Sequence, residues 1–321
     1  MPDAHCHGSV IGGGEAPQLI AWDTVTLQNH RPVACLSAAE RFNFLVTNRI
    51  PRRWLTLLIG WFSRIESPLL ARISIGVWQR FVDDLRLEEA ESREFSSLQA
   101  CFTRSLRAGA RPVDPAPDML TSPCDAVVGE FGDTNGLEVI QAKGFPYGLD
   151  ELLADGELAE TCRDGRFVTL RLKSSMYHRF HAPWPGRVGR VTYVSGDTWN
   201  VNPVALKVVE RLFCRNERAV IEIDTAAGRL LLVPVAAVLV ACMRIHGLPV
   251  PLDLRYRGPN RIDCDRSFRK GEEMGWFEQG STIILLTTKR FQFVDSLVTG
   301  EVIRMGQPLM RLLPGGDTGM P

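Results

Sequence analysis

The sequence lacks most of the patterns that assign a chain to a common functional class. Its eight cysteines form no CxxC pair, and their spacing fits neither a zinc site nor a dense disulfide scaffold. No GxGxxG or Walker glycine loop supports nucleotide binding, and no GxSxG elbow marks a serine hydrolase. Lys and Arg together number 37, as do Asp and Glu, so no basic excess points to nucleic acid.

Long apolar runs are missing as well. A membrane-spanning helix needs about 20 apolar residues, and the longest run, LLLVPVAAVLVACM (230–243), is shorter and predicts two buried strands meeting at a turn. The N-terminus has no basic region followed by an apolar core, so no secretory signal is expected. Reduced thiols in a cytoplasmic setting are therefore expected. The HCH at 5–7 predicts no metal site, because three adjacent residues do not easily converge on one ion.

The chain divides into three parts by composition. Residues 1–40 are rich in Gly, Pro and His without a clear period, which predicts a poorly ordered extension. Residues 41–107 have helical spacing, and residues 108–321 contain short β-branched runs between turn residues. The expected fold class is α+β, with N-terminal membrane-associating helices before a β-rich, sandwich or barrel-like catalytic domain.

Two segments of the helical part carry most of this prediction. Four apolar residues at spacings of three and four predict one helix face: Phe95, Leu98, Phe102 and Leu106. RFNFLVTNRIPRRWLTLLIGWFSRI (41–65) contains five arginines, no acidic residue and two tryptophans. That pattern favours a helix lying among lipid head groups. The alternative is a core helix with a solvated basic end.

Four residues of the β-rich part carry groups able to do chemistry. Asp125 lies in SPCDAVVGEFG, His178 and His181 lie in YHRFHAPWPGRV, and Ser281 lies in FEQGSTIILLTTKR. A serine nucleophile needs a base, and a histidine base needs an acceptor that fixes its tautomer. The order Asp, His, Ser is compatible with a nucleophilic triad. Ordinary turn residues remain the alternative on spacing alone.

An ordered set of blocks resembles the phosphatidylserine decarboxylase family, in its pyruvoyl-dependent, bacterial, membrane-associated type. The resemblance covers roughly residues 95–312. The blocks are FTRSLRAGARPVD (102–114), SPCDAVVG (122–129), KGFPYGLDELL (143–153), YHRFHAPWPGRV (177–188), NVNPVALKVVERLFCRNERAV (200–220) and KGEEMGWFEQGSTIILL (270–286). The chain departs from the family pattern at four positions: Ala126, Gly148, Met176 and Gln279.

The resemblance implies that the chain makes its own cofactor. The hydroxyl of Ser281 would attack the carbonyl of Gly280, and elimination would leave a covalent pyruvoyl group on an α chain that begins at position 281. The β chain would be 1–280. By the same resemblance His181 is the base and Asp125 is its orienter. Phosphatidylserine would then form a Schiff base with the pyruvoyl group and lose CO₂ to give phosphatidylethanolamine. His178 is the candidate proton donor, unless it makes only a structural hydrogen bond.

The expected partners are phosphatidylserine and an anionic membrane surface, at the cytoplasmic side of the cell membrane as a peripheral protein. A homodimer of cleaved units is also expected from the family. Three alternatives stay open: a pyruvoyl-dependent decarboxylase of a soluble amino acid, a non-processing membrane-peripheral relative, and a serine hydrolase that keeps its serine. GEVIRMGQPLM (300–310) resembles a turn of biotinyl and lipoyl carriers, but it contains no lysine.

Overall fold

The computed structural model describes residues 37, 38, 40, 52–82, 84–141, 145–206, 208–237, 242–253, 255–278 and 281–314. The helices are α2 Arg52–Ser63, α3 Pro68–Gln79, η3 Leu87–Glu89, α4 Leu98–Phe102, α5 Leu149–Leu153, α6 Gly156–Glu160, α7 Pro203–Leu206 and α8 Leu212–Arg215. The strands are β1 Met119–Thr121, β2 Ala126–Asp133, β3 Glu138–Ile140, β4 Pro146–Gly148, β5 Arg166–Arg171, β6 Arg179–His181, β7 Gly186–Val194, β8 Arg218–Thr225, β9 Gly228–Ala236, β10 Cys242–Ile245, β11 Leu252–Asp253, β12 Arg261–Phe268, β13 Glu273–Phe277, β14 Ser281–Thr287, β15 Phe291–Phe293, β16 Val302–Ile303 and β17 Pro308–Leu312. The predicted β-rich character of the chain is confirmed.

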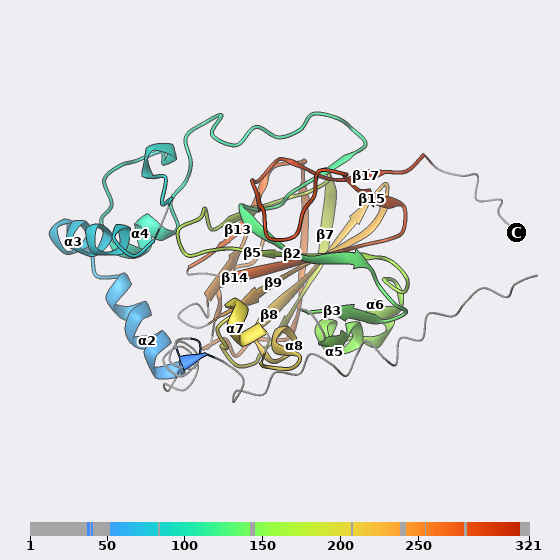
Figure 1. The fold of residues 1–321 in the computed structure, drawn as a ribbon, viewed down its shortest axis with the longest axis horizontal. Helices are drawn as coiled ribbons and strands as arrows, with labels where there is room; N and C mark the ends of the chain where they lie inside the picture. The colour runs from blue at the N-terminus through green and yellow to red at the C-terminus, as the bar shows by residue number, and fades with distance from the viewer. Residues whose placement is uncertain are drawn as a thin grey trace, which may run out of the picture.

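One eight-stranded antiparallel sheet forms the centre of the molecule, in the order β12-β7-β8-β9-β14-β5-β2-β16. A four-stranded sheet, β11-β10-β13-β6, and a three-stranded sheet, β1-β17-β15, contribute to the core on one of its faces. The short helices α5 to α8 and the hairpin β3-β4 contribute to the core on the other face, and they lie along the lower side of the body in Figure 1. The central sheet is therefore covered on both faces.

Strand β14 shows why its sequence is a continuous apolar run. Ile283 and Leu285 belong to the core cluster on one face of the sheet, and Ile284 and Leu286 belong to the cluster on the other face. All four side chains are fully buried. A strand covered on one face alternates apolar and polar residues, whereas a strand covered on both faces has no polar side. Such burial holds the start of β14 rigidly in place.

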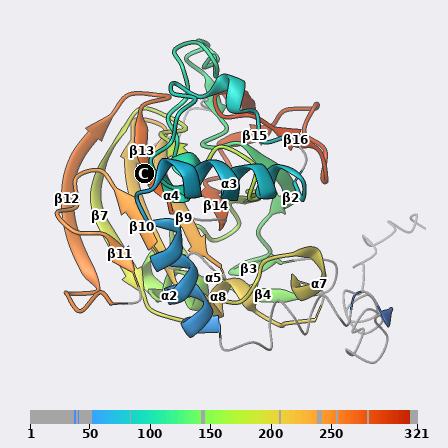
Figure 2. The ribbon, with the colours of Figure 1, turned by 90° about the vertical axis from the view of Figure 1, so that its left-hand side faces the viewer.

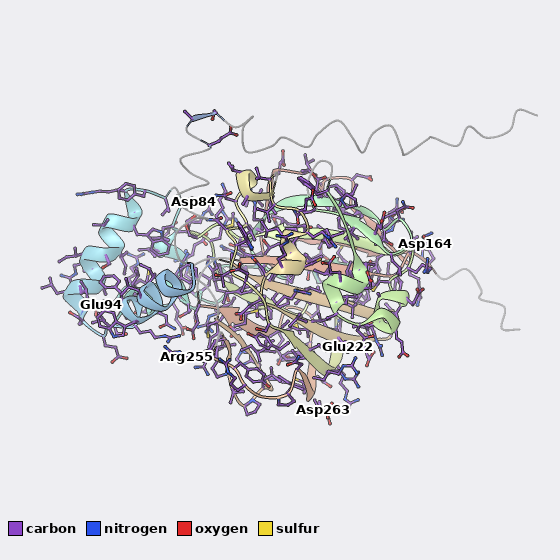
Figure 3. The ribbon with its side chains drawn as sticks, turned by 90° about the horizontal axis from the view of Figure 1, so that it is seen from below. Asp84, Glu94, Asp164, Glu222, Arg255 and Asp263 are labelled. Atoms are coloured by element: carbon purple, nitrogen blue, oxygen red, sulfur yellow. The ribbon has the colours of Figure 1, made fainter. Side chains whose placement is uncertain are left out.

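The helices α2, α3 and α4 lie at one end of the β body, as Figure 1 shows. Seen from that end in Figure 2, α3 and α2 cross in front of the central strands. Ser67 caps α3 and Ser97 caps α4, each accepting a backbone N–H at its helix start. A small cluster that includes Ala71, Ile75 and Cys101 holds α3 against α4. In Figure 3, Asp164 lies at the end of the body away from these helices.

Within the part of the chain that the structure describes, no helix is both long and apolar enough to cross a membrane. The described residues of the run at 230–243 belong to two strands, β9 and β10, as predicted, with Pro234 inside β9 opposite Ile283. Residues 238–241 lie outside the described residues, so the predicted turn is not tested. Residues 1–36, 39 and 41–51 lie outside the described residues, so the predicted extension and the first part of the arginine-rich segment are not tested.

The single helix predicted from Phe95 to Leu106 is wrong in its extent. Helix α4 spans only Leu98–Phe102, and Leu106 forms a β-bridge with Ala90 instead. The helix ends at Phe102, and Arg104 is buried in the interior. Its guanidinium donates to the carbonyl oxygens of Cys101, Leu85 and Ser175. Tertiary contacts thus override the helical period.

Candidate active site

The predicted cleavage position lies where the chain passes from one sheet to another. Strand β13 belongs to the four-stranded sheet, and β14 begins at Ser281 in the centre of the eight-stranded sheet. Ser281 pairs with Ala236 of β9, and the next residue, Thr282, pairs with Arg171 of β5. The strand predicted after Ser281 is confirmed. Gly280, Gln279 and the side chain of Ser281 lie outside the described residues.

His181 ends β6 and is 8% exposed. Its Nδ1 lies 2.9 Å from the carbonyl oxygen of Gly271, which can only accept, so Nδ1 carries the proton. Nε2 then has a lone pair and accepts the hydroxyl of Tyr177 at 3.0 Å. Burial lowers the pKa of His181, against raising effects of the Gly271 hydrogen bond and nearby acidic groups. The ring is therefore a neutral base near pH 7.

Tyr177 was not assigned a specific role from the sequence. Burial raises the pKa of its hydroxyl far above the ordinary value, so the hydroxyl stays protonated and donates to His181. A hydroxyl within hydrogen-bond distance of a neutral imidazole is the geometry of a general base and its substrate. Here a tyrosine hydroxyl occupies the position that a serine nucleophile needs.

Asp125 is fully buried beside the start of β2. Its carboxylate accepts Nε of Arg111 at 2.8 Å, Nη2 of Arg111 at 2.6 Å and Nη1 of Arg304 at 3.0 Å. The backbone N–H of Met305 donates to it at 2.9 Å. Burial alone would raise the pKa of Asp125, but Arg111, Met305 and Arg304 together hold it below the ordinary value. Asp125 is therefore an ionised group inside a clamp of donors.

The structure brings the Asp125 block beside the His181 block. The backbone N–H of His181 donates to the carbonyl of Pro123 at 2.8 Å. Among the contacts of the described residues, however, no hydrogen bond joins the side chains of Asp125 and His181. The carboxylate is occupied by arginines and the imidazole by Gly271 and Tyr177. The role of Asp125 as orienter of His181 stays a prediction.

His178 is fully buried with its ring on that of Phe102, at 3.9 Å between ring centroids. Nδ1 donates to the carbonyl oxygen of Met176 at 2.8 Å, and Nε2 is buried without a hydrogen-bond partner in the described structure. Burial lowers the pKa of His178 to about 3. The side chain therefore presents an unprotonated, unsatisfied Nε2, and its role as proton donor stays a prediction.

A cavity of about 1000 Å³ lies between the helical end and the start of β14. Most of its apolar lining comes from α2, α3, α4 and the residues after α3, and the rest from the β body: Ile59, Phe62, Leu70, Ile73, Val77, Trp78, Phe81, Val82, Leu98 and Phe102, with Leu172 and Val201. Its polar lining comes from the end of β5 and two loops, and in smaller part from the helices: Arg171, Lys173, Ser174, Ser175, Asn200 and Asn202, with Ser63, Ser74 and Gln99. Ala237, next to the residue that pairs with Ser281, also lines it. The cavity thus reaches the neighbourhood of the predicted cleavage position.

Arg64, the residue that follows helix α2, forms an ion pair with Glu278 in the segment before Ser281. Nη2 of Arg64 lies 2.5 Å from Oε2 of Glu278, and Arg244 lies 3.7 Å from the other oxygen of that carboxylate. The hydrogen bond to Glu278 raises the pKa of Arg64. The position of α2 and the geometry before Ser281 are therefore linked by a direct contact.

Two features of this region had no signal in the sequence. Arg111 and Arg304 lie far apart along the chain, and both bind the Asp125 carboxylate. The segment compared with carrier turns, 300–310, supplies Arg304 and Met305 to that clamp. No group of His, Cys, Asp and Glu able to hold a metal ion occurs in the described ranges. The HCH at 5–7 lies outside them.

Comparison with known proteins places the chain among enzymes of one kind. A family model described as phosphatidylserine decarboxylase matches residues 98–311. The phosphatidylserine decarboxylase proenzyme of Dickeya dadantii (strain 3937) is 32% identical over 284 residues, covering 85% of this chain and 93% of that protein. The protein of that name from Halorhodospira halophila is 38% identical over 283 residues, covering 86% and 96%. The chain belongs to the phosphatidylserine decarboxylase family.

Proposed function

We propose that this protein is a phosphatidylserine decarboxylase, a pyruvoyl-dependent carboxy-lyase that releases CO₂ and phosphatidylethanolamine. It is made as a proenzyme and cleaves itself between Gly280 and Ser281. The observation that carries the proposal is the position of Ser281 at the start of β14, between neighbours that line the apolar cavity. A group formed there is carried by a strand that is covered on both faces, next to residues that line a space suited to a lipid.

Self-cleavage uses groups that the chain itself provides. The Ser281 hydroxyl attacks the Gly280 carbonyl, so that the C–N bond breaks and an ester forms. Loss of the α-proton of residue 281 then expels the Gly280 carboxylate, and water hydrolyses the resulting enamine to a pyruvoyl group and ammonia. His181, which is neutral at Nε2, is the base in this sequence. His181 acts as this base after the Tyr177 hydroxyl has moved away from Nε2.

Two unsatisfied polar groups in segments next to position 281 support a pyruvoyl group there: Thr282 follows it in β14, and the carbonyl of His178 accepts the backbone N–H of Phe277. Nε2 of His178 and Oγ1 of Thr282 are buried without hydrogen-bond partners in the part of the chain that the structure describes. A pyruvoyl group supplies a carbonyl that condenses with an amine and withdraws electrons as CO₂ leaves. Because Nδ1 of His178 is bound to Met176, this residue acts through Nε2. Nε2 must take up a proton before it returns one to the substrate carbon.

The helical end supports contact with a membrane surface. Six large hydrophobic side chains on α2, α3 and the turn after α3 are between 47% and 83% exposed: Leu58, Trp61, Leu69, Ile73, Val77 and Phe81. Exposed apolar patches of this kind mark interaction sites. Arg72 and Arg80 are exposed on the same segment, which favours an anionic surface. We place the protein peripherally on the cytoplasmic side of the cell membrane, as a homodimer of cleaved units by family expectation.

Intact mass under denaturing conditions tests the cleavage, and CO₂ release tests the reaction. We expect two chains that divide between residues 280 and 281, and a single chain in the Ser281→Ala variant. The purified protein should release CO₂ from phosphatidylserine vesicles and not from free serine. Release from free serine would support the soluble amino acid decarboxylase instead. A single uncut chain with an ordinary serine would refute the proposal.

A further inference from the structure

Arg171 differs from the other arginines of the interior. It is the last residue of β5, is half-buried, and lines the cavity described above. Its guanidinium has no ion pair or hydrogen bond among the described residues. Every other described arginine that is buried or half-buried contacts a carboxylate or a backbone carbonyl. Arg104 and Arg218 are bound by carbonyl oxygens, and Arg111 is bound by two carboxylates.

A half-buried guanidinium without a protein partner is unfavourable. Taking a charge out of water costs free energy unless a partner replaces the water. Burial accordingly lowers the pKa of Arg171, and no nearby charge opposes the effect. An unpaired cation in a cavity next to β14 indicates that the cavity binds an anionic ligand. The guanidinium geometry suits a phosphate or a carboxylate with two oxygens.

The cavity itself is amphiphilic in a directed way. Its helical side is mainly apolar and includes Phe62, Ile73 and Val77 beside the smaller polar residues Ser63, Ser74 and Gln99, whereas its charged side chains, Arg171 and the exposed Lys173, come from the β body. A ligand that fits both ends has hydrocarbon on one side and an anion on the other. Such a ligand is a glycerophospholipid, whose phosphate lies between its acyl chains and its head group. This arrangement would direct the head group beyond Arg171, toward the start of β14.

Phosphatidylserine offers two anions, and the chemistry selects between them. A salt bridge to the carboxylate would stabilise the charge that disappears as CO₂ leaves, and it would therefore slow the reaction. A salt bridge to the phosphodiester is unchanged between substrate and transition state, so it contributes binding alone. Arg171 pairs in register with Thr282, one residue from Ser281. In the lipid, a few bonds likewise separate the phosphorus from the amine.

We propose that Arg171 binds the phosphodiester of the lipid substrate and so sets the preference for phosphatidylserine over unphosphorylated serine compounds. This inference rests on the proposed function for the identity of the lipid. Arg171 is then a specificity-determining residue. Its loss should change the affinity for substrate and leave the chemical step nearly intact.

The kinetic experiment uses Arg171→Gln, Arg171→Lys and a matched control, Arg187→Gln. Arg187 is exposed on β7 and is paired with Asp265. With soluble dihexanoyl phosphatidylserine, Arg171→Gln should raise KM roughly ten- to a hundredfold with kcat within about threefold. Arg171→Lys should recover part of the affinity, and Arg187→Gln should match the wild type. An unchanged KM, or a fall in kcat alone, would overturn the inference.

A binding experiment separates this inference from the proposed function. The uncut Ser281→Ala protein should bind dihexanoyl phosphatidic acid by calorimetry, and adding Arg171→Gln should weaken that binding by the same factor as KM. Wild-type protein that binds this lipid but releases no CO₂ from phosphatidylserine would refute the function and retain the phosphate site. Without ligand, Ser281→Ala/Arg171→Gln should melt at or above the temperature of Ser281→Ala. A lower melting temperature combined with unchanged lipid affinity would make Arg171 structural and refute the site.

Discussion

Replacing Asp125 with asparagine tests whether this carboxylate stabilises the folded protein. The Ser281→Ala background keeps the chain in one piece, so unfolding involves a single molecule. The side chain is fully buried, and four N–H donors of Arg111, Arg304 and Met305 bind it. Asparagine has nearly the same shape but lacks the charge, and its amide group points a donor at an arginine.

The structure decides the size of the expected effect. Removing one partner of a buried ion pair costs about 3–5 kcal/mol of unfolding free energy. Both arginines keep a second carboxylate in the variant, because Arg111 contacts Glu89 at 2.7 Å and Arg304 contacts Asp84 at 3.2 Å. Neither cation is then left without a counter-charge. We therefore expect a loss near the lower limit, about 3 kcal/mol.

The effect should depend on pH in a defined direction. The pKa of Asp125 is lower in the folded protein than in the unfolded chain, where it is about 3.9. Its contribution is therefore fully present above about pH 4 and is lost as the pH falls through the lower folded value. Urea unfolding of Ser281→Ala and Ser281→Ala/Asp125→Asn at pH 7 and in acid measures both. A difference below about 1 kcal/mol at pH 7, or one that persists unchanged in acid, would refute the clamp.

Three further changes test the catalytic histidines and the helical end. His178→Gln should still cleave itself but should lower kcat by about 10²–10⁴-fold; wild-type turnover would give the residue a structural role alone. Tyr177→Phe should cleave itself at least as fast as the wild type on denaturing gels, because Nε2 of His181 loses a competing donor. A Tyr177→Phe chain that stays uncut would assign Tyr177 to proton transfer. Trp61→Ser should weaken binding to phosphatidylglycerol vesicles, measured by sedimentation, at least about tenfold. Val250 is an exposed apolar residue on the β body, so Val250→Ser should leave this binding unchanged. Equal effects of the two substitutions would argue against the helical end as the membrane contact.

Local chemistry explains what was predictable from the sequence. The four consecutive residues Ile283, Ile284, Leu285 and Leu286 are all apolar, as expected of a strand covered on both faces. His178 and His181 lie in one short block, so their common burial follows from a single local segment. The chemistry expected of Ser281 came from the resemblance of whole blocks, because isolated Asp, His and Ser residues are too common to be specific.

Long-range contacts explain what was not predictable. Arg304 reaches Asp125 across nearly the whole catalytic region of the sequence, and no local pattern records such a pairing. The helical period from Phe95 to Leu106 was misleading, because Arg104 and Leu106 are fixed by partners elsewhere in the chain. Likewise, the isolation of Arg171 became visible only when the neighbours of its strand were known.

Strand β14 also determines how the processed protein loses its folded structure. With the chain cut before Ser281, as proposed, residues 281–321 hold the central strand between β9 and β5 and also carry Arg304 to Asp125. The smaller chain cannot leave without opening the middle of the sheet, so its dissociation should be as slow as global unfolding. Once unfolded, two separate chains would have to meet again, and recovery would become second order in concentration. The lifetime of the mature enzyme is then set by an unfolding rate and not by an equilibrium.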